Sequence, residues 1–278
     1  MNEHGIVDGS TYVKSDIWGG KRAANYYLGG DILRIDVCIA LDDELMPADY
    51  RRIFLSLFKH AMQEYSEKKL LYYFGGEAMK KNYCWAVNLP GAKFSGDTVT
   101  LSKSELTLRF STPDAAVFSD FYNALNAIRG KAYSHNGVTM CIKDIFMPPM
   151  NRVTSGSITA HMISPLVLRE HDAKTNKDVY FTAESEDFEI RLRDTVRNRL
   201  NDFCEDAALA DTLEVLDVSR ARRTVIRYYG MKFHATIGDI VLRGDPKLLE
   251  WMRLIGIGSH CSAGFGMFNA VERRYDNG

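Results

Sequence analysis

Two closely spaced pairs of glycines near the end of the chain suit the binding of a phosphate group. They are two G-x-G motifs, separated by five residues, in the run from Gly256 to Phe268. Glycine weakens the interior of helices and strands, but it adopts positive φ angles and lets the backbone approach another group closely. Backbone amides in such loops form concave anion sites. The run therefore predicts either a phosphate-binding loop or a tight connection in which glycine only avoids steric clashes. In the first interpretation the contacts come from Gly256, Gly258, Ser259, His260, Gly264 and Gly266.

The neighbours of this glycine loop argue against two familiar nucleotide sites. Asp245 and Pro246 before it are typical of the start of a helix. Residues 265–271 after it are typical of a strand. A dinucleotide-binding fingerprint needs the opposite order, which is strand, glycine turn and helix. A P-loop is disfavoured too, because no Lys and Ser or Thr follow the glycines.

A second candidate site is a basic run that contains no acidic residue. It extends from Ser219 to His234 and carries Tyr228 and Tyr229 among its cations. The run predicts a β-hairpin with arginines on both faces, which suits an RNA stem that is recognised through its phosphates and its shape. Arginine also makes forked phosphate contacts that lysine cannot make. The alternative is a solvated edge strand whose charges prevent aggregation. The cations are Arg220, Arg222, Arg223, Arg227 and Lys232.

Composition limits the class of protein. The 278 residues are 46% hydrophobic and carry a net charge of −1. Such a chain buries a proper core, and any nucleic-acid site must come from a local basic face, since the chain as a whole is not basic. Five cysteines stand far apart without a C-x-x-C pair, which argues against zinc and a disulfide framework and favours a reduced, cytoplasmic chain. We expect no signal peptide and no membrane span.

The elements that must position these residues follow one plan twice. In the first half, hydrophobic periodicity gives the order strand, helix, strand, strand, helix, strand, which is ferredoxin-like, and the second half repeats it less cleanly. In the first half we expect strands over residues 31–41, 83–89, 99–101, 105–110 and 138–147, and helices over 49–69 and 113–129. In the second half we expect strands over 157–168, 179–181, 213–218, 224–229, 232–242 and 265–271, and helices over 184–205 and from Pro246.

The expected fold is therefore an α+β chain of two tandem ferredoxin-like (RRM-like) domains. Pro148 and Pro149 mark the boundary between a domain of residues 30–150 and a domain of residues 151–278. Residues 1–29 are rich in Gly, Ser, Tyr and Asn and lack periodicity, so we expect a lead that is disordered or derived from an expression vector.

The glycine loop resembles the C-terminal signature of the CRISPR-associated repeat endoribonucleases, the Cas6 family. The resemblance rests on Gly256-Ile257-Gly258, on Ser262 and on Gly264-Phe265-Gly266-Met267, and more loosely on residues 93–97 and 164–167. It implies an enzyme that cuts the repeat RNA of a CRISPR precursor without a metal or cofactor. In that reaction the ribose 2′-hydroxyl attacks the adjacent phosphate and leaves a cyclic phosphate. The implied partner is CRISPR repeat RNA. The resemblance leaves open whether the chain also binds other effector subunits or forms a homodimer.

The resemblance also implies a catalytic histidine on or near the first helix, where this chain has His60. Histidine is well suited to proton transfer near neutral pH. On a helical wheel His60 falls at the edge of the apolar stripe, where an imidazole is partly walled but reachable. The alternative is a rim histidine without a role. The competing histidines are His135, His161, His234 and His260, and no pair is spaced like metal ligands.

The sequence leaves two alternatives to the endoribonuclease open. One is a non-cleaving RNA-binding subunit of a CRISPR effector complex, and the other is an α+β protein that binds a small phosphorylated ligand.

Overall fold

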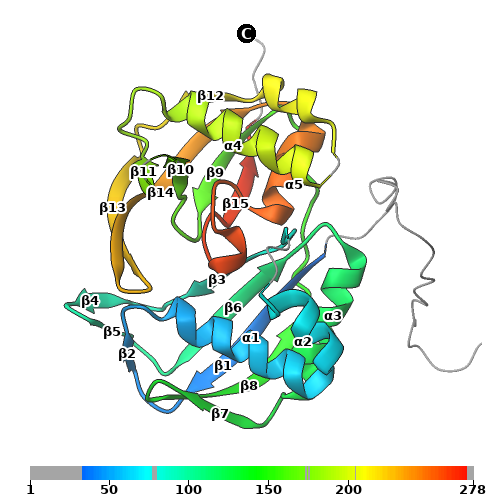
Figure 1. Cartoon of the computed structure of the whole chain (residues 1–278), viewed down its shortest axis with the longest axis vertical. Helices are drawn as coiled ribbons and strands as arrows, with labels where there is room; N and C mark the ends of the chain where they lie inside the picture. The colour runs from blue at the N-terminus through cyan, green and yellow to red at the C-terminus, as the bar shows by residue number, and fades with distance from the viewer. Residues whose placement is uncertain (1–32, 77–79, 173, 175, 204, 274–278) are drawn as a thin grey trace, which may run out of the picture.

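The computed structural model describes residues 33–76, 80–172, 174, 176–203 and 205–273. The predicted lead of residues 1–29 and Cys204 lie outside these residues. Figure 1 shows two α+β halves, the first coloured blue to green and the second green to red, stacked along the long axis of the molecule.

The first half is a ferredoxin-like sheet with helices on one face. Its strand order is β3-β6-β1-β8-β7. The four strands β3, β6, β1 and β8 reproduce the ferredoxin order, and β7 adds an edge. Alternation along β1 buries Ile35, Val37 and Ile39 completely, as expected for a central strand. The elements are β1 Arg34–Leu41, β3 Cys84–Asn88, β6 Glu105–Ser111, α3 Ala115–Ala127, β7 Ala132–His135 and β8 Val138–Phe146.

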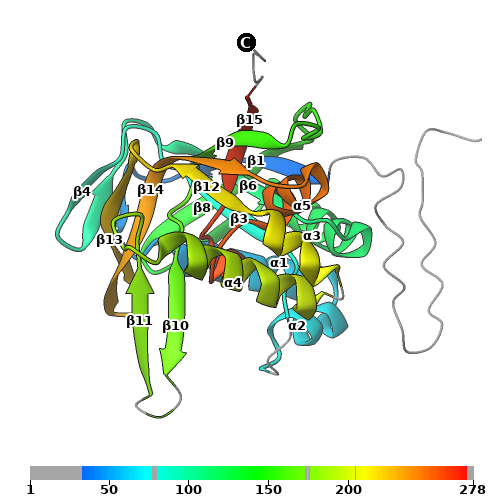
Figure 2. The same ribbon diagram turned by 90° about the horizontal axis from the view of Figure 1, so that it is seen from above.

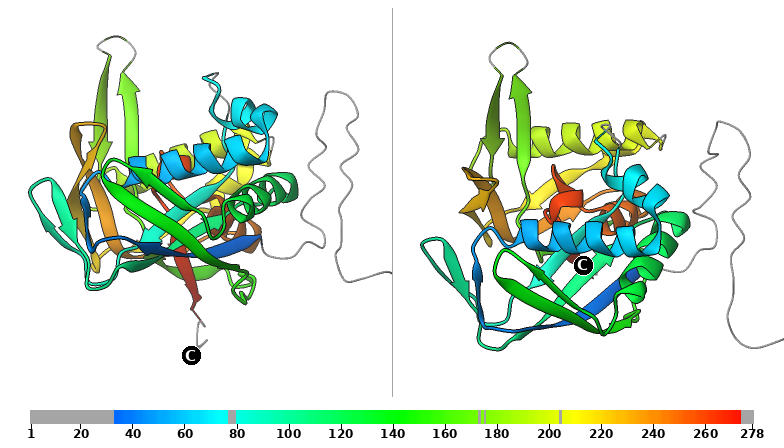
Figure 3. Two further views of the ribbon diagram at one scale, coloured as in Figure 1. Left: turned by 90° about the horizontal axis from the view of Figure 1, so that it is seen from below. Right: turned by 60° about the horizontal axis from the view of Figure 1, so that its bottom comes forward.

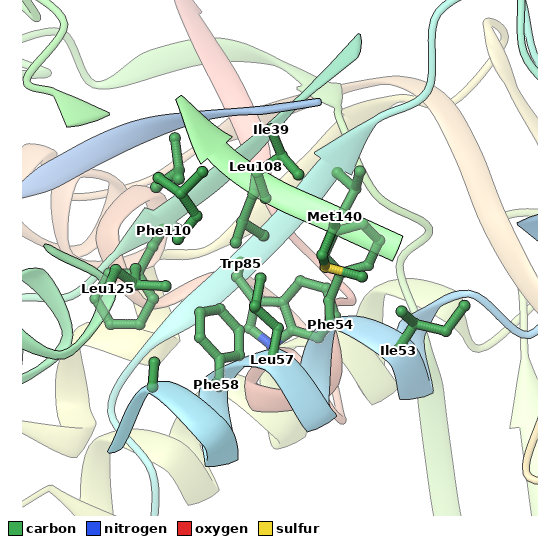
Figure 4. Packing of buried hydrophobic residues seen from close by; sticks show 14 of the residues in the cluster. Ile39, Ile53, Phe54, Leu57, Phe58, Trp85, Leu108, Phe110, Leu125 and Met140 are labelled. Carbon is green, nitrogen blue, oxygen red and sulfur yellow. The ribbon is translucent and has the colours of Figure 1, made fainter. Parts of the chain in front are cut away.

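The helix expected over residues 49–69 is two helices, α1 Arg51–Tyr65 and α2 Glu67–Phe74. Ser66 separates them in an extended conformation, with φ −169° and ψ 117°. The apolar stripe of α1 packs on the sheet, where Phe58 meets Trp85 edge-on at 5.5 Å between ring centroids (Figure 4). This aromatic core fixes the rotation of α1 and therefore which of its side chains face solvent.

Two hairpins flank the first sheet. The strand β7 was not expected from the sequence, and it joins β8 through Asn136 and Gly137, whose φ angles are 49° and 76°. A small side sheet has the order β2-β5-β4, with β2 Leu45–Pro47, β4 Lys93–Ser95 and β5 Thr98–Thr100. The strand expected over residues 99–101 therefore belongs to this side sheet and not to the central one.

The second half repeats the ferredoxin order as β12-β14-β9-β15, and β13 pairs with β14. Tandem ferredoxin-like domains are thus confirmed. A hairpin of β10 Leu168–Asp172 and β11 Lys177–Phe181 projects from the body beside α4 (Figure 2). The elements are β9 Ser157–Met162, α4 Phe188–Asp202, η1 Ala207–Thr212, β12 Glu214–Asp217, β13 Ala221–Tyr228, β14 Met231–Arg243, α5 Pro246–Ile255, η2 Cys261–Ala263 and β15 Phe268–Glu272.

Buried hydrogen bonds join the two halves along β3 and β6. The indole Nε1–H of Trp85 donates to the Ser262 carbonyl at 2.8 Å. The Ser111 hydroxyl donates to the Leu254 carbonyl at 2.8 Å, and the Cys84 thiol donates to the Phe265 carbonyl at 3.3 Å. Each of these three acceptors is a backbone carbonyl of the α5–β15 segment, so this segment is held in a fixed position on the first sheet.

Among the described residues, no helix is long and apolar enough to cross a membrane.

Replacing Trp85 with Phe is expected to destabilise the protein. The substitution leaves the Ser262 carbonyl without its donor and opens a small cavity, so the free energy of unfolding falls by about 1–3 kcal/mol. Urea unfolding measures the loss. An unchanged free energy of unfolding would show that this contact does not hold the halves together.

Candidate functional site

The glycine loop is a packed junction between the two halves. Gly256, Gly258, Gly264 and Gly266 all have positive φ, between 70° and 90°. A Cβ at Gly264 would lie 2.7 Å from the Trp85 ring, which is too close unless the ring or the loop shifts. All four glycines are buried. The steric interpretation of their spacing therefore accounts for them.

The amides of this loop bond within the protein. The Gly266 N–H donates to the Pro165 carbonyl at 2.9 Å, and the Gly264 N–H donates to the Cys261 carbonyl at 3.2 Å. The Ser259 N–H donates to Val167 at 2.7 Å. These amides are not aimed at an external anion, so the predicted phosphate cradle is absent at these three positions. The side chains of Ser259 and His260 remain half-exposed.

His260 is less suited to phosphate than the sequence suggested. Burial lowers the pKa of its imidazole, and the nearby Arg169 guanidinium lowers it further. The ring is therefore neutral at pH 7 and offers a hydrogen bond rather than a positive charge. Its φ of 61° places it in the left-handed region, where it starts the short helix η2.

Arg199 fixes the loop from the side of α4. Its guanidinium donates to the carbonyls of Ile255 and Gly256 at 2.9 and 2.7 Å, which satisfies the end of α5. It also contacts the Cys261 sulfur at 3.0 Å. Burial alone would raise the pKa of Cys261, but hydrogen bonds from Cys84 and Arg199 outweigh it and bring the pKa to about 7.

The N-terminus of α1 is seated on the same loop. Arg51 is buried, and its Nε–H donates to the Gly264 carbonyl at 3.0 Å. Its guanidinium lies over the Phe265 ring at 4.2 Å and near the Tyr50 ring at 4.7 Å. Because Arg51 is locked in this way, the first turn of α1 has one position relative to the second half.

The basic hairpin forms as the sequence predicts, and its register places the cations on both faces. Arg227 pairs with Lys232 across the strands, whereas Arg222 pairs with Ile237 on the other face. Arg223 forms an ion pair with Glu184 at 3.5 Å. Within the described part of the chain, neither Arg222 nor Lys232 forms an ion pair, and both are exposed, as is Arg220.

The tip of this hairpin docks on the first half beside α1. The Tyr229 N–H donates to Asp49 Oδ2 at 3.0 Å, and Arg227 forms an ion pair with Asp97. The Arg52 guanidinium lies 4.8 Å from the centre of the Tyr229 ring. The basic hairpin and the exposed side of α1 therefore form one continuous surface.

One row of side chains leads from this tip along α1. Arg52, Ser56 and His60 are spaced by four residues, so they lie on one ridge of the helix. Eight residues of helix separate Arg52 from His60, or about 12 Å. The β7–β8 hairpin lies beside α1 (Figure 3).

His60 lies in a polar cluster at the end of the ridge. Its ring stacks on Tyr133 at 4.5 Å with an angle of 12° between the planes. The ring of His135 is parallel to Tyr133 at 6.4 Å. The Ser56 hydroxyl is 2.7 Å from the Tyr133 hydroxyl and 3.3 Å from His135 Nδ1. Two half-exposed imidazoles thus lie near one tyrosine.

The structure separates His60 from the glycine loop. The loop packs on β3, at one edge of the first sheet, whereas His60 stacks on β7, at the opposite edge. Four strand spacings lie between these edges, or about 19 Å. His60 and the loop are therefore not parts of one pocket.

The β3 side of α1 carries another chemical feature that sequence reasoning missed. Lys59 and Lys81 both lie near the Phe74 ring, at 5.9 and 5.0 Å. Burial lowers the pKa of Lys81, and the positive charge of Lys59 adds to this effect. A lysine with a lowered pKa is a candidate for proton transfer. No local motif marks it, because Lys59 and Lys81 meet only in the folded chain.

The remaining histidines lie elsewhere. His161 on β9 is held by Asp239 at 2.5 Å, and His171 is held by Asp178 at 2.9 Å. His234 is exposed on β14. Among the described residues, no three His, Cys, Asp or Glu side chains form a group that would hold a metal ion.

A cleft of about 360 Å³ lies between the β10–β11 hairpin and α4. It is lined by three arginines, but each is already paired with a carboxylate within 3.1 Å, so the cleft attracts anions weakly. The pairs are Arg169 with Asp178, Arg191 with Glu170 and Arg197 with Asp194.

The fold and the site define a class of proteins with two tandem ferredoxin-like domains. In this chain a glycine loop joins the two domains beside a basic hairpin. Residues 147–270 match the family model described as CRISPR associated protein Cas6, C-terminal. This match identifies residues 147–270 as a Cas6 C-terminal region, and the fold of the described chain is that of Cas6 proteins. No curated protein matches the chain significantly.

Solved structures share the fold over nearly the whole described chain. One is described as a Cas6-related gene product from Pyrococcus furiosus, with 13% identity, a TM-score of 0.74, and coverage of 88% of this chain and 100% of that one. An RAMP protein described as binding different RNA substrates has 16% identity, a TM-score of 0.72, and coverage of 86% and 99%. A Cas6 product complex has 16% identity, a TM-score of 0.65, and coverage of 86% and 100%.

Gly264→Ala tests the packing role of the loop. The new Cβ meets the Trp85 ring, and the positive φ disfavours a side chain, so we expect the free energy of unfolding to fall by at least about 1–3 kcal/mol. Thermal or urea unfolding measures it. Gly137→Ala is a matched control, since its φ is also positive but no atom lies within 4 Å of the added Cβ. Equal losses for the two variants would refute a packing role.

Proposed function

We propose that this protein is a metal-independent endoribonuclease that cuts CRISPR precursor RNA within its repeat. The family, the basic hairpin and the histidine cluster support this function. Relatives of the same fold include an RAMP protein binding different RNA substrates and a Cas6 product complex. We propose CRISPR repeat RNA as the partner of this chain.

The reaction transfers two protons. A base removes the proton of the ribose 2′-hydroxyl, whose oxygen attacks the adjacent phosphorus. The bond from phosphorus to the 5′-oxygen breaks, and an acid protonates the leaving oxygen. The products are a 2′,3′-cyclic phosphate and a 5′-hydroxyl. General acid–base catalysis of this kind needs groups that titrate near neutral pH, and imidazole is the side chain that does so without perturbation.

The observation that carries the proposal is the cluster at the end of the α1 ridge. The rings of His60 and His135 both lie near Tyr133 and nearly parallel to it, and both are half-exposed. In this proposal the two imidazoles supply the acid and the base. We assign His60 as the principal proton-transfer residue and His135 as its partner.

The ridge also gives the RNA a path. A phosphate held by Lys232 on the hairpin leads to Arg52, which begins the row that ends at His60. In this arrangement the glycine loop acts beneath the RNA as the support of α1.

His60→Ala is expected to abolish cutting of the protein's own repeat RNA in the presence of a chelator, with little loss of binding. His135→Ala is expected to slow the cut by about 10²–10⁴-fold, the usual contribution of an acid or base. Single-turnover rates and end-group analysis of the products measure both. His161→Ala is the control, because its ring lies on β9 and is held by Asp239.

Two results would change this assignment. A cut that survives in both histidine variants and is lost in Lys81→Ala would place it on the β3 side of α1. Tight binding without any cut by the wild type would favour the non-cleaving RNA-binding subunit.

Removing two unpaired cations of the hairpin, with Arg222→Ala and Lys232→Ala, is expected to weaken RNA binding. Each lost phosphate contact lowers the slope of log affinity against log salt by about 0.7–0.9. Titrations at several salt concentrations measure the slope. Arg243→Ala, at the far end of β14, is the control, and an unchanged slope in the hairpin variants would exclude these cations from the site.

A further inference from the structure

The tip of the basic hairpin is built with a residue that the turn does not favour. Tyr229 and Gly230 have φ angles of 50° and 76°, which is the pattern of a two-residue type I′ turn. Such turns favour Asn, Asp or Gly at the first position, because a bulky side chain is strained there. The same chain uses the favoured residue in the β7–β8 hairpin, where Asn136 and Gly137 have φ angles of 49° and 76°.

Core packing does not explain the tyrosine at this position. Its side chain is 53% exposed. The backbone beneath it is fixed, since the Tyr229 N–H donates to Asp49 Oδ2 at 3.0 Å. Tyr228 stands perpendicular to it at 4.7 Å, and the Arg52 guanidinium lies 4.8 Å from the ring centre. A strained position that is held firmly and presents a ring to solvent is typical of a functional contact.

The surface around Tyr229 has the composition of a single-strand RNA site. Met231, on the same hairpin, is 55% exposed, and Phe94, on the neighbouring β4–β5 hairpin, is 61% exposed. The two hairpins lie side by side in the views of Figures 1 and 2. Lys232 and Lys93 add exposed positive charges. Aromatic rings that stack on bases, placed between cations that bind phosphates, are how proteins hold unpaired nucleotides.

We propose that Tyr229 is a stacking platform for an unpaired nucleobase of the RNA, with Arg52 and Lys232 binding the phosphates on either side. This inference rests on the proposed RNA function and goes further, because it assigns the chemical class of the ligand. A base inside a stem is already stacked and does not reach the ring. The substrate therefore has an unpaired nucleotide near the cut, about 12 Å along α1 from His60.

Tyr229→Asn separates this role from folding. Asparagine suits the left-handed position, so the midpoint of thermal unfolding is expected to stay the same or rise. The ring is lost, so affinity for single-stranded RNA is expected to fall about 5- to 150-fold, the usual effect of removing one base–aromatic stack. The probe is a short single-stranded oligoadenosine that carries one 2-aminopurine, titrated in chelator. Its fluorescence is quenched when the base stacks on the wild-type protein.

Three controls make the result specific. Tyr229→Phe keeps the ring and is expected to retain both affinity and quenching. Tyr72→Asn makes the same change at an exposed tyrosine of α2 and is expected to bind like the wild type. Affinity for a blunt RNA duplex is expected to be the same in all of these proteins.

Several outcomes would overturn the inference. Wild-type affinity of Tyr229→Asn for the single strand would exclude stacking, and an equal loss for single strand and duplex would show that the tip binds backbone only. Loss of a co-purifying protein subunit with unchanged RNA affinity would make the tip a protein-docking surface. If the wild-type protein binds neither the single strand nor the duplex, the proposed function fails as well. If Tyr229→Asn cuts repeat RNA normally and binds it with full affinity, only the stacking role is excluded.

Discussion

The seating of the glycine loop on β3 is the contact on which the rest of the molecule depends. Gly264 lies directly against the Trp85 ring, and a side chain at this position would collide with it. The Trp85 Nε1–H and the Arg51 guanidinium both bond to carbonyls of this loop. The loop thus carries one contact to the sheet of the first domain and another to the start of α1. The glycines act by being small and by adopting positive φ, and the amides of Gly264 and Gly266 are occupied within the protein.

This seating gives α1 a fixed direction between the two domains. Its first turn lies under the tip of the basic hairpin, and its other end reaches the β7–β8 hairpin. The ridge of Arg52, Ser56 and His60 therefore connects a surface that suits phosphates with a surface that suits proton transfer. The distance between the loop and His60 follows from the width of the sheet.

Much of the fold could be predicted from the sequence, because periodicity is a local signal. The alternation of Ile35, Val37 and Ile39 and the stripe of α1 both lead to the observed elements. The strand β7 was missed because it is short and half polar, although Asn136-Gly137 is a recognisable hairpin turn. Tyr133 and Lys81 were missed for another reason. Their neighbours are far away in the chain, and only the folded sheet brings them to α1. The spacing of the glycines was informative, but spacing alone does not tell a phosphate cradle from a packed junction.

The path of the RNA along α1 is the central claim, and photocrosslinking tests it directly. Repeat RNA that carries 4-thiouridine at successive positions around the cut would be irradiated on the protein in chelator, and the crosslinked peptides would be identified by mass spectrometry. The account predicts adducts on the hairpin tip at Tyr229, on the α1 ridge and on β7 near Tyr133, in this order along the RNA. Adducts confined to the opposite side of α1, around Lys59 and Lys81, or to the second domain alone, would contradict it.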